Sequence, residues 1–320
     1  MRKFRFIPDN THIRFMWLRR INFPVSVVLS TLALILFFTI GPNFGIDFRG
    51  GTLIEIKPVD ASYNLSDIRS QVNALNLGDV QVTEVTDLGA EKTVLIRIQQ
   101  QEGGETAQQE AVAKVRDTFG DTVEFRRVES VGPRVSSELA YNGTVALLVT
   151  LVAILAYVWF RFEWQFAVGA IIATTHDVFL TLGFFVISQV DFSLSSIAAI
   201  LTIVGYSLND TVVVYDRIRE NLRKYKKMPI TELLDLSVNE TLSRTTMTSF
   251  TTLLALLALF IFGGEVIRSF VAAMLFGVLI GTYSSIYIAA PVLIFFKLRP
   301  GGGSDAAEEG EAPAEAAGKA

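Results

Sequence analysis

The sequence predicts a polytopic α-helical membrane protein with six transmembrane helices and one extramembrane α+β domain between the first two. Three observations support this fold class. Hydrophobic residues make up 51% of the 320 residues and charged residues only 19%, below the roughly 25% usual in soluble domains. Six apolar runs have about the 20 residues that a helix needs to cross a bilayer. The insert after the first run has the shorter periodicities of strands and small helices.

The six apolar runs are predicted to span the membrane at 21–40, 141–160, 166–187, 194–214, 244–262 and 270–296. The first run is too long for a signal-peptide core of about 7–15 residues, and no small-residue cleavage site follows it, so we expect an uncleaved anchor. The predicted division is therefore an N-terminal segment (1–20), helix one (21–40), an outer domain (41–138), helices two to six (139–298) with a connection at 215–243, and a tail (299–320).

The distribution of Lys and Arg predicts the orientation. Basic residues precede the first run, follow the fourth and follow the sixth: Arg2, Lys3, Arg5, Arg14, Arg19, Arg20, Arg217, Arg219, Arg223, Lys224, Lys226, Lys227, Lys297 and Arg299. Because short basic segments stay on the cytoplasmic side, we expect both termini and the 215–243 connection in the cytoplasm. The 41–138 domain then faces the periplasm of a protein in the bacterial inner membrane.

The outer domain has the order β-α-β-β-α-β, which is typical of the ferredoxin-like fold. Strand patterns lie at 52–57, 80–85, 94–98 and from 123 onward. Asn64 is a predicted N-cap of the first helix. Thr106 and Gln109 form a predicted capping box for the second helix, which Gly120 ends. Beyond residue 299 the sequence is rich in Gly, Ala and Glu without apolar periodicity, so we expect a disordered tail.

Composition excludes several kinds of chemistry. The chain has no cysteine and only two histidines, His12 and His176, so disulfides, thiolate metal sites and a multi-histidine metal site are not expected. It has no H-E-x-x-H, G-x-S-x-G or Walker A motif. We therefore expect neither an enzyme nor ATP hydrolysis by this chain, and energy for any work must come from another source such as the proton gradient.

Ionisable residues inside membrane spans are costly and by default indicate function. His176 and Asp177 lie near the middle of the third run, Asn209 and Asp210 lie in the fourth, and Arg244 begins the fifth. The fourth and fifth runs are antiparallel, so Asp210 and Arg244 fall at similar depths. A carboxylate that alternates between a paired and an unpaired state can carry a proton.

Helical spacing adds two hydroxyls to this hypothesis, because Tyr206 and Ser207 precede Asp210 by about one turn. Structural alternatives stay open for each residue. Asp210 could simply end its span, Arg244 could be an ordinary interfacial anchor, and His176 and Asp177 could be satisfied structural groups. In the sixth run, Gly277 and Gly281 form a small-xxx-small pair that favours close helix packing.

Four segments resemble the SecF branch of the SecD/SecF protein-export family. They are FGIDFRGGT at 44–52, THD at 175–177, VGYSLNDTVVVYDRIREN at 204–221 and NETLSRT at 239–245. The resemblance covers roughly residues 41–298 in order. The family signature falls on Gly45, Asp47, Phe48, Gly50 and Gly51.

The resemblance implies a subunit that pairs with SecD beside the SecYEG translocon and uses the proton-motive force to help move a preprotein across the lipid membrane, without a cofactor. Asp210 and Arg244 match the intramembrane proton pathway of the family, and the proton-relay candidates are Asp210, Arg244, Asn209, Tyr206, Asp177 and His176. A proton-coupled small-molecule efflux subunit and a passive translocon scaffold are the alternatives. The insert is small for an efflux porter domain, and a scaffold does not need the Asp210–Arg244 pair.

Overall fold

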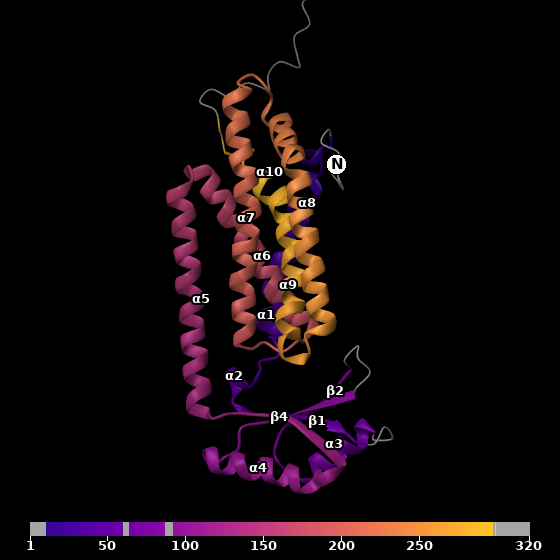
Figure 1. The fold of residues 1–320 in the computed structure, drawn as a ribbon. Coiled ribbons are helices and arrows are strands. Elements are labelled where there is room, and N and C mark those ends of the chain that lie inside the picture. The colour runs from indigo at the N-terminus through magenta and orange to yellow at the C-terminus, as the bar shows by residue number, and fades with distance from the viewer. Residues whose placement is uncertain (1–10, 60–63, 87–91, 297, 299–320) are drawn as a thin grey trace, which may run out of the picture.

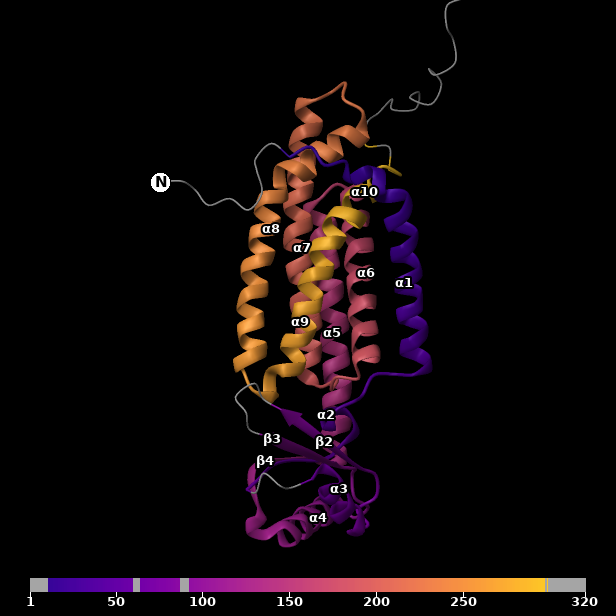
Figure 2. The same cartoon turned by 90° about the vertical axis from the view of Figure 1, so that its right-hand side faces the viewer.

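The computed structural model describes residues 11–59, 64–86, 92–296 and 298. Its membrane part is a bundle of long apolar helices with the extramembrane domain at one end (Figures 1 and 2). The bundle contains α1 (Arg19–Thr39, after the 3-10 turn Phe15–Leu18), α5 (Pro133–Arg161), α6 (Trp164–Ser188), α7 (Leu194–Lys224), α8 (Ile230–Phe262) and α9 (Glu265–Ser284). A π-helical turn, Ser285–Ala289, and the short α10 (Ala290–Val292) continue α9. Six segments of the described chain are long and apolar enough to cross a membrane, which confirms the predicted number.

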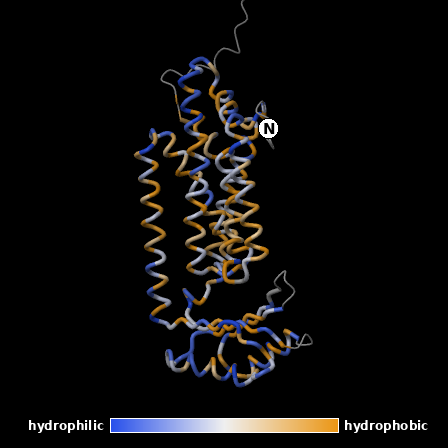
Figure 3. Tube along the Cα trace, in the orientation of Figure 1, coloured by the Kyte–Doolittle hydropathy of each residue, from blue (hydrophilic) through white to orange (hydrophobic). Residues whose placement is uncertain are grey.

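Several helices extend beyond the apolar runs. α5 begins at Pro133, which provides the preformed φ of a first helical position, and α8 begins at Ile230. The connection at 215–243 is consequently helical over most of its length. Polar contacts hold its two arms together: Arg217 Nε lies 2.7 Å from Glu240 Oε2, and Asn221 donates to Ser237 Oγ at 3.0 Å. The hydropathy colouring in Figure 3 shows this polar extension above the apolar part of the bundle.

α6 and α7 form the centre of the bundle, whereas α1, α5 and α8 expose most of their apolar side chains. α5 stands apart from the other helices in Figure 1. α7 packs closely against α9, where a Cβ added at Gly281 would lie 3.0 Å from Ser207 Cβ and one at Gly277 2.3 Å from an Ile203 side-chain carbon. The close packing expected from Gly277 and Gly281 is therefore present.

The extramembrane domain consists of β1 (Gly51–Pro58), α3 (Leu65–Ala74), β2 (Val80–Thr86), β3 (Lys92–Ile98), α4 (Gly104–Phe119), the 3-10 turn Gly120–Thr122 and β4 (Val123–Val131). Its four strands form an antiparallel sheet in the order β2-β3-β1-β4. This arrangement confirms the predicted βαββαβ fold. Helices α3 and α4 cover one face of the sheet, and the other face is turned toward the membrane helices (Figure 1).

Two predictions concern where the helices of this domain begin. Asn64 is the N-cap of α3 and its side chain accepts from Ser66 N at 3.3 Å, as predicted. The predicted capping box of Thr106 and Gln109 is wrong, because α4 begins earlier, with Gly103 as its N-cap and no side-chain cap. Gly103 and Gly104 both have positive φ, of 122° and 74°, and this backbone turns the chain into the helix before Thr106. The predicted tail at 299–320 lies outside the described residues.

Candidate functional site

The first buried carboxylate, Asp177, has hydrogen-bond partners from two neighbouring helices and its own. It is fully buried on α6. Ser207 of α7 donates to its Oδ2 at 2.5 Å, and Ser284 at the end of α9 donates to the same oxygen at 2.7 Å. Nδ1 of His176 lies 2.9 Å from Oδ1. Both carboxylate oxygens are thereby satisfied, and three helices are tied together at one point.

The second buried carboxylate, Asp210, has a different environment. It lies one turn beyond Ser207 on α7 and is only 3% exposed. Its Oδ2 is buried and has no hydrogen-bond partner among the described residues, and the same holds for the hydroxyls of Thr211 and of Thr245 on α8. A buried polar atom of this kind is unusual and calls for a specific explanation.

Arg244 of α8 is close enough to attract the Asp210 carboxylate electrostatically. Within the described part of the chain, however, no ion pair of 4.0 Å or less joins the two residues. Arg244 is exposed on the surface of the chain, as is Asn209 on α7. The close pairing proposed from helix depth therefore stays a prediction, since in this conformation charge attraction acts without contact.

The two hydroxyls that helical spacing placed beside Asp210 turn elsewhere. Ser207 donates to Asp177, as described above. Tyr206 Oη lies 3.4 Å from Ser249 Oγ of α8, which in turn lies 2.6 Å from the Thr282 hydroxyl of α9. Hydroxyl groups can both donate and accept, so each of these side chains can act as donor or acceptor inside the bundle.

Sequence reasoning missed Ser284, which lies far from Asp177 along the chain. The π-helical turn at Ser285–Ala289 follows it directly, and such turns are frequent at functional sites in helices. The one sequence signal for Ser284 is the adjacent pair Ser284-Ser285 in an otherwise apolar run. Such a pair is weak evidence for a polar site. His176, in contrast, contacts Asp177 as its sequence neighbour; its Nε2 is buried without a partner among the described residues.

A second region joins the extramembrane domain to the bundle through the signature segment, 44–51, which includes the one-turn helix α2 (Ile46–Arg49). Gly45 N donates to Phe192 O at 2.8 Å, and a bridge pairs Phe44 with Phe192 in the link between α6 and α7. The Asp47 carboxylate accepts from Leu194 N at 2.9 Å, the first residue of α7. The ring of Phe48 packs against Phe192, with centroids 5.6 Å apart.

The backbone conformation explains why the last two residues of this segment are glycines. Gly50 and Gly51 have φ values of 72° and 113°. A Cβ at Gly51 would lie 2.4 Å from Ile98 O, a backbone atom of β3. Both positions therefore require glycine, and the turn they form leads directly from α2 into β1.

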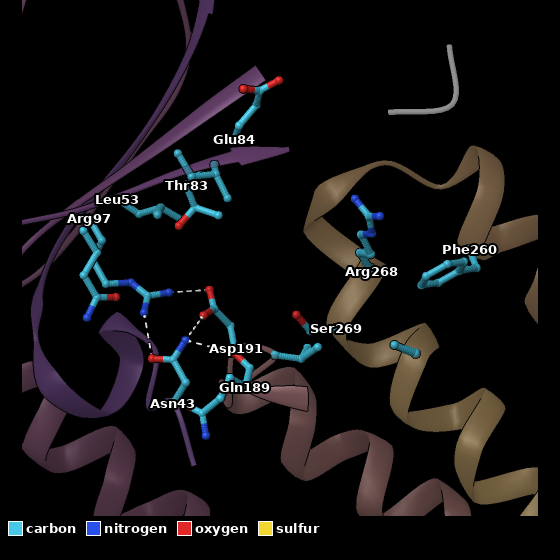
Figure 4. A pocket seen from close by; sticks show the side chains of 14 residues that line it. Asn43, Leu53, Thr83, Glu84, Arg97, Gln189, Asp191, Phe260, Arg268 and Ser269 are labelled. Carbon is cyan, nitrogen blue, oxygen red and sulfur yellow. Dashed lines mark hydrogen bonds and ion pairs between the residues drawn. The ribbon is translucent and has the colours of Figure 1, made fainter. Parts of the chain in front are cut away.

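A polar network supports this connection, as Figure 4 shows. Arg97 on β3 makes an ion pair with Asp191 in the α6–α7 link and donates to Asn43 Oδ1 at 3.2 Å. Asn43 Nδ2 donates to Asp191 Oδ1 at 2.8 Å. These residues line a cavity of about 560 Å³ between the open face of the sheet and the ends of α8 and α9, where Phe260 and Ser269 form the opposite wall.

Metal binding has no support in the described residues, which contain no group of three His, Cys, Asp or Glu side chains able to hold an ion. The arrangement can instead hold and exchange protons through carboxylates, an imidazole and hydroxyls. It also connects α7, which carries Asp210, to the domain outside the membrane.

Comparisons with known proteins agree with the motifs. Residues 111–299 match the family described as protein export membrane protein SecD/SecF, C-terminal, and residues 35–59 match the SecD/SecF GG motif. The chain is 44% identical to the protein translocase subunit SecF of Cereibacter sphaeroides, covering 94% of each chain, and 46% identical to that of Rhodobacter capsulatus, covering 92% of each.

Longer relatives contain the same region. The chain is 45% identical to the protein translocase subunit SecDF of Brucella abortus, covering 93% of this chain but only 39% of the relative. Among solved structures, SecDF from Thermus, described as a translocon-associated membrane protein, matches with a TM-score of 0.81 at 36% identity over 92% of this chain and 40% of that one. SecDF in a super-membrane-facing form matches with a TM-score of 0.66 at 36% identity over 90% of this chain and 39% of that one.

Proposed function

The chain belongs to the SecD/SecF family of protein-export membrane proteins, and from that membership we propose that it works with a SecD-type partner to drive protein export with the proton-motive force. In this proposal the pair acts beside the SecYEG translocon and promotes movement of a preprotein across the membrane lipid. The longer SecDF relatives support the SecD-type partner, since in them a region like this chain is part of a larger protein. The chain acts as a transport subunit and not as an enzyme.

The observation that carries the proton-coupled part is the environment of Asp210. Its side chain is buried in an apolar membrane bundle, and its Oδ2 has no hydrogen-bond partner in the described chain. An ionised carboxylate in such a place is costly. The cost is explained if Asp210 binds a proton when Arg244 withdraws and releases it when Arg244 approaches. A passive scaffold has no use for this arrangement.

The neighbouring groups suggest a route for the proton. Ser207 is one turn from Asp210 on the same helix and is hydrogen-bonded to Asp177. Asp177 contacts His176 in turn. We therefore propose Asp210 as the carrier, with Arg244 as its charge partner and the Ser207–Asp177–His176 chain as the adjoining relay; Tyr206 and Asn209 lie on the adjacent surface of α7.

The test is Asp210→Asn, which retains the shape of the side chain and removes the titratable carboxylate. We expect it to abolish gradient-stimulated export of a reporter protein in energised membrane vesicles with ATP held constant. Asp216→Asn is the matched control, since Asp216 lies on the same helix with a half-exposed side chain. Full stimulation with Asp210→Asn would leave the scaffold function in place of the proton-driven one.

The proposed location is the bacterial inner membrane, with both termini in the cytoplasm and the sheet domain in the periplasm. Reporter fusions at Gln101 in the domain and at Lys226 in the α7–α8 connection distinguish the two sides. We expect a periplasmic reporter to be active at Gln101 alone. Activity of a cytoplasmic reporter at Gln101 would reverse the orientation.

A further inference from the structure

The N-terminus of α7 is held by a residue that belongs to a distant part of the chain. Asp47 of the signature segment accepts a hydrogen bond from the backbone N–H of Leu194 at 2.9 Å. This N–H is one of the groups that a helix leaves unsatisfied at its start. The carboxylate also lies at the positive end of the helix dipole, where a negative charge is stabilising.

Local residues also cap this helix start, so the bond from Asp47 comes in addition to a local cap. Ser193 and Ser196 form a reciprocal capping box, in which Ser193 N donates to Ser196 Oγ at 3.1 Å. Local sequence thus supplies the helix cap, and Asp47 adds a bond from outside it. Besides stabilising the helix start, this bond connects the helix with α2 and β1.

The connection has several parallel contacts. Gly45 and Phe192 form a backbone hydrogen bond, and the Phe48 and Phe192 rings pack together. On the other side of the link, Arg97 of β3 pairs with Asp191 (Figure 4). The sheet domain is therefore attached to the start of α7 both through its leading segment and through one of its central strands.

α7 continues without interruption from this attachment to Asp210. At 1.5 Å per residue, Leu194 and Asp210 lie about 24 Å apart along one helix. A continuous helix is stiff over this length, so a displacement of its buried half reaches its start. The signature glycines then pass it to the sheet, since Gly50 and Gly51 connect α2 to β1 within two residues.

We propose that Asp47 is a positioning residue that couples the membrane-embedded proton site to the periplasmic domain by holding α7 and the signature segment together as one unit. This inference rests on the proposed proton-driven function. It assigns a mechanical role to the signature segment: α7 and the sheet domain move together because this joint stays closed.

The test starts with Asp47→Leu, which retains bulk and removes the acceptor. We expect gradient-stimulated export to fall at least five-fold, while ATP-only export, chain level and co-purification with the SecD-type partner stay within two-fold of wild type. Asp117→Asn on the exposed face of α4 is the control and should behave as wild type. Retention of stimulated export by Asp47→Leu would overturn the proposal.

A disulfide provides the decisive rescue. A Cβ added at Gly45 would lie 3.6 Å from Ser193 Cβ, within the 3.5–4.5 Å that disulfides require, and the chain has no cysteine of its own. In the Asp47→Leu background, the oxidised Gly45→Cys/Ser193→Cys pair should return stimulated export to within two-fold of wild type, and a reductant should remove this rescue. Failure of the oxidised pair to restore export would overturn the coupling role.

Two further arms keep the proposal testable. If Asp47→Leu does not accumulate, the same cysteine pair is examined with Asp47 intact: stimulated export that survives oxidation supports a joint that stays closed, and reversible loss on oxidation overturns it. Asp210→Asn is measured in parallel. Full stimulation by that variant defeats the proton-driven function itself, whereas loss in Asp210→Asn together with wild-type behaviour in Asp47→Leu defeats the joint alone.

Discussion

Two aspartates lie buried in the same helix bundle, one turn of α7 apart in depth, yet their surroundings differ. Asp177 accepts two serine hydroxyls and contacts an imidazole, so both of its oxygens are satisfied. Asp210 has a buried oxygen without a partner among the described residues and a charge partner, Arg244, that attracts it without contact. The same side chain is fixed in one place and left available for change in the other.

The difference separates two roles that the sequence alone presented as one. A carboxylate with a complete set of donors stabilises one arrangement of three helices, because any movement breaks buried hydrogen bonds. A carboxylate whose buried oxygen has no donor breaks no hydrogen bond at that oxygen when it moves or binds a proton. Burial alone therefore does not distinguish the two aspartates, whereas the number of their hydrogen-bond partners does.

The largest expected difference is in stability. Asp177→Ala removes the carboxylate partner of Ser207 and of His176 and leaves Ser284 with its 3.2 Å bond to Gly281 O. An unsatisfied buried group costs about 1–3 kcal/mol. We expect the free energy of unfolding in detergent to fall by about 3 kcal/mol or more. Asp210→Ala should change it by less than about 1 kcal/mol, since no described partner is lost. Equal losses in the two variants would remove the distinction drawn above.

A smaller effect is expected where α9 packs against α7. Gly281→Ala places a Cβ 3.0 Å from Ser207 Cβ and 3.3 Å from its backbone Cα, so the helices must separate beside the Asp177 site. Overpacking of this kind costs about 1–3 kcal/mol. Gly205→Ala, on an open face of α7 with no atom within 4 Å, is the control and should show no loss in thermal unfolding. A silent Gly281→Ala would mean that the Ser207–Asp177 bond does not depend on this close approach.

The smallest effect concerns Arg244, which belongs to the Asp210 side of the comparison. Arg244→Lys retains the charge but loses the planar group that binds a carboxylate through two bonds, so we expect gradient-stimulated export to fall by about 2- to 5-fold. Stability should not change, because Arg244 is exposed and makes no ion pair in the described chain. Wild-type export by Arg244→Lys would show that the positive charge suffices, as for an interfacial anchor.

Much of the fold was predictable because its signals are local. Apolar runs predict the membrane spans. Alternating apolar and polar residues predict the strands of the small domain, and Asn64 and Gly120 predict where its first helix begins and its second helix ends. The helical extensions around Arg217 and Glu240 were not predictable from hydropathy, since ion pairs between two polar helix arms stabilise them. Likewise, Gly103 and Gly104 start α4 before the predicted cap at Thr106, because their backbone conformation sets the helix start.

The two buried aspartates were predictable from the sequence, whereas their hydrogen-bond partners were not. Membrane depth identified Asp177 and Asp210, and adjacency placed His176 beside Asp177. Helical spacing assigned Ser207 to Asp210, but its hydroxyl turns to Asp177. Ser284 comes from another helix, so no spacing within one segment could indicate it. Contacts between helices depend on how the helices rotate against one another, and that rotation is set by packing at residues such as Gly281.

The contact between Gly281 and Ser207 has a geometric consequence for α7. Ile203, one turn earlier, meets Gly277 in the same close approach. A stiff rod held closely near its middle in this way turns about that place more easily than it slides. From Ser207, α7 extends about 20 Å to Leu194 and about 26 Å to Lys224, at 1.5 Å per residue. A tilt at this fulcrum therefore moves the two ends in opposite directions by similar amounts, so that a single event in the middle of the membrane can be detected on both of its surfaces.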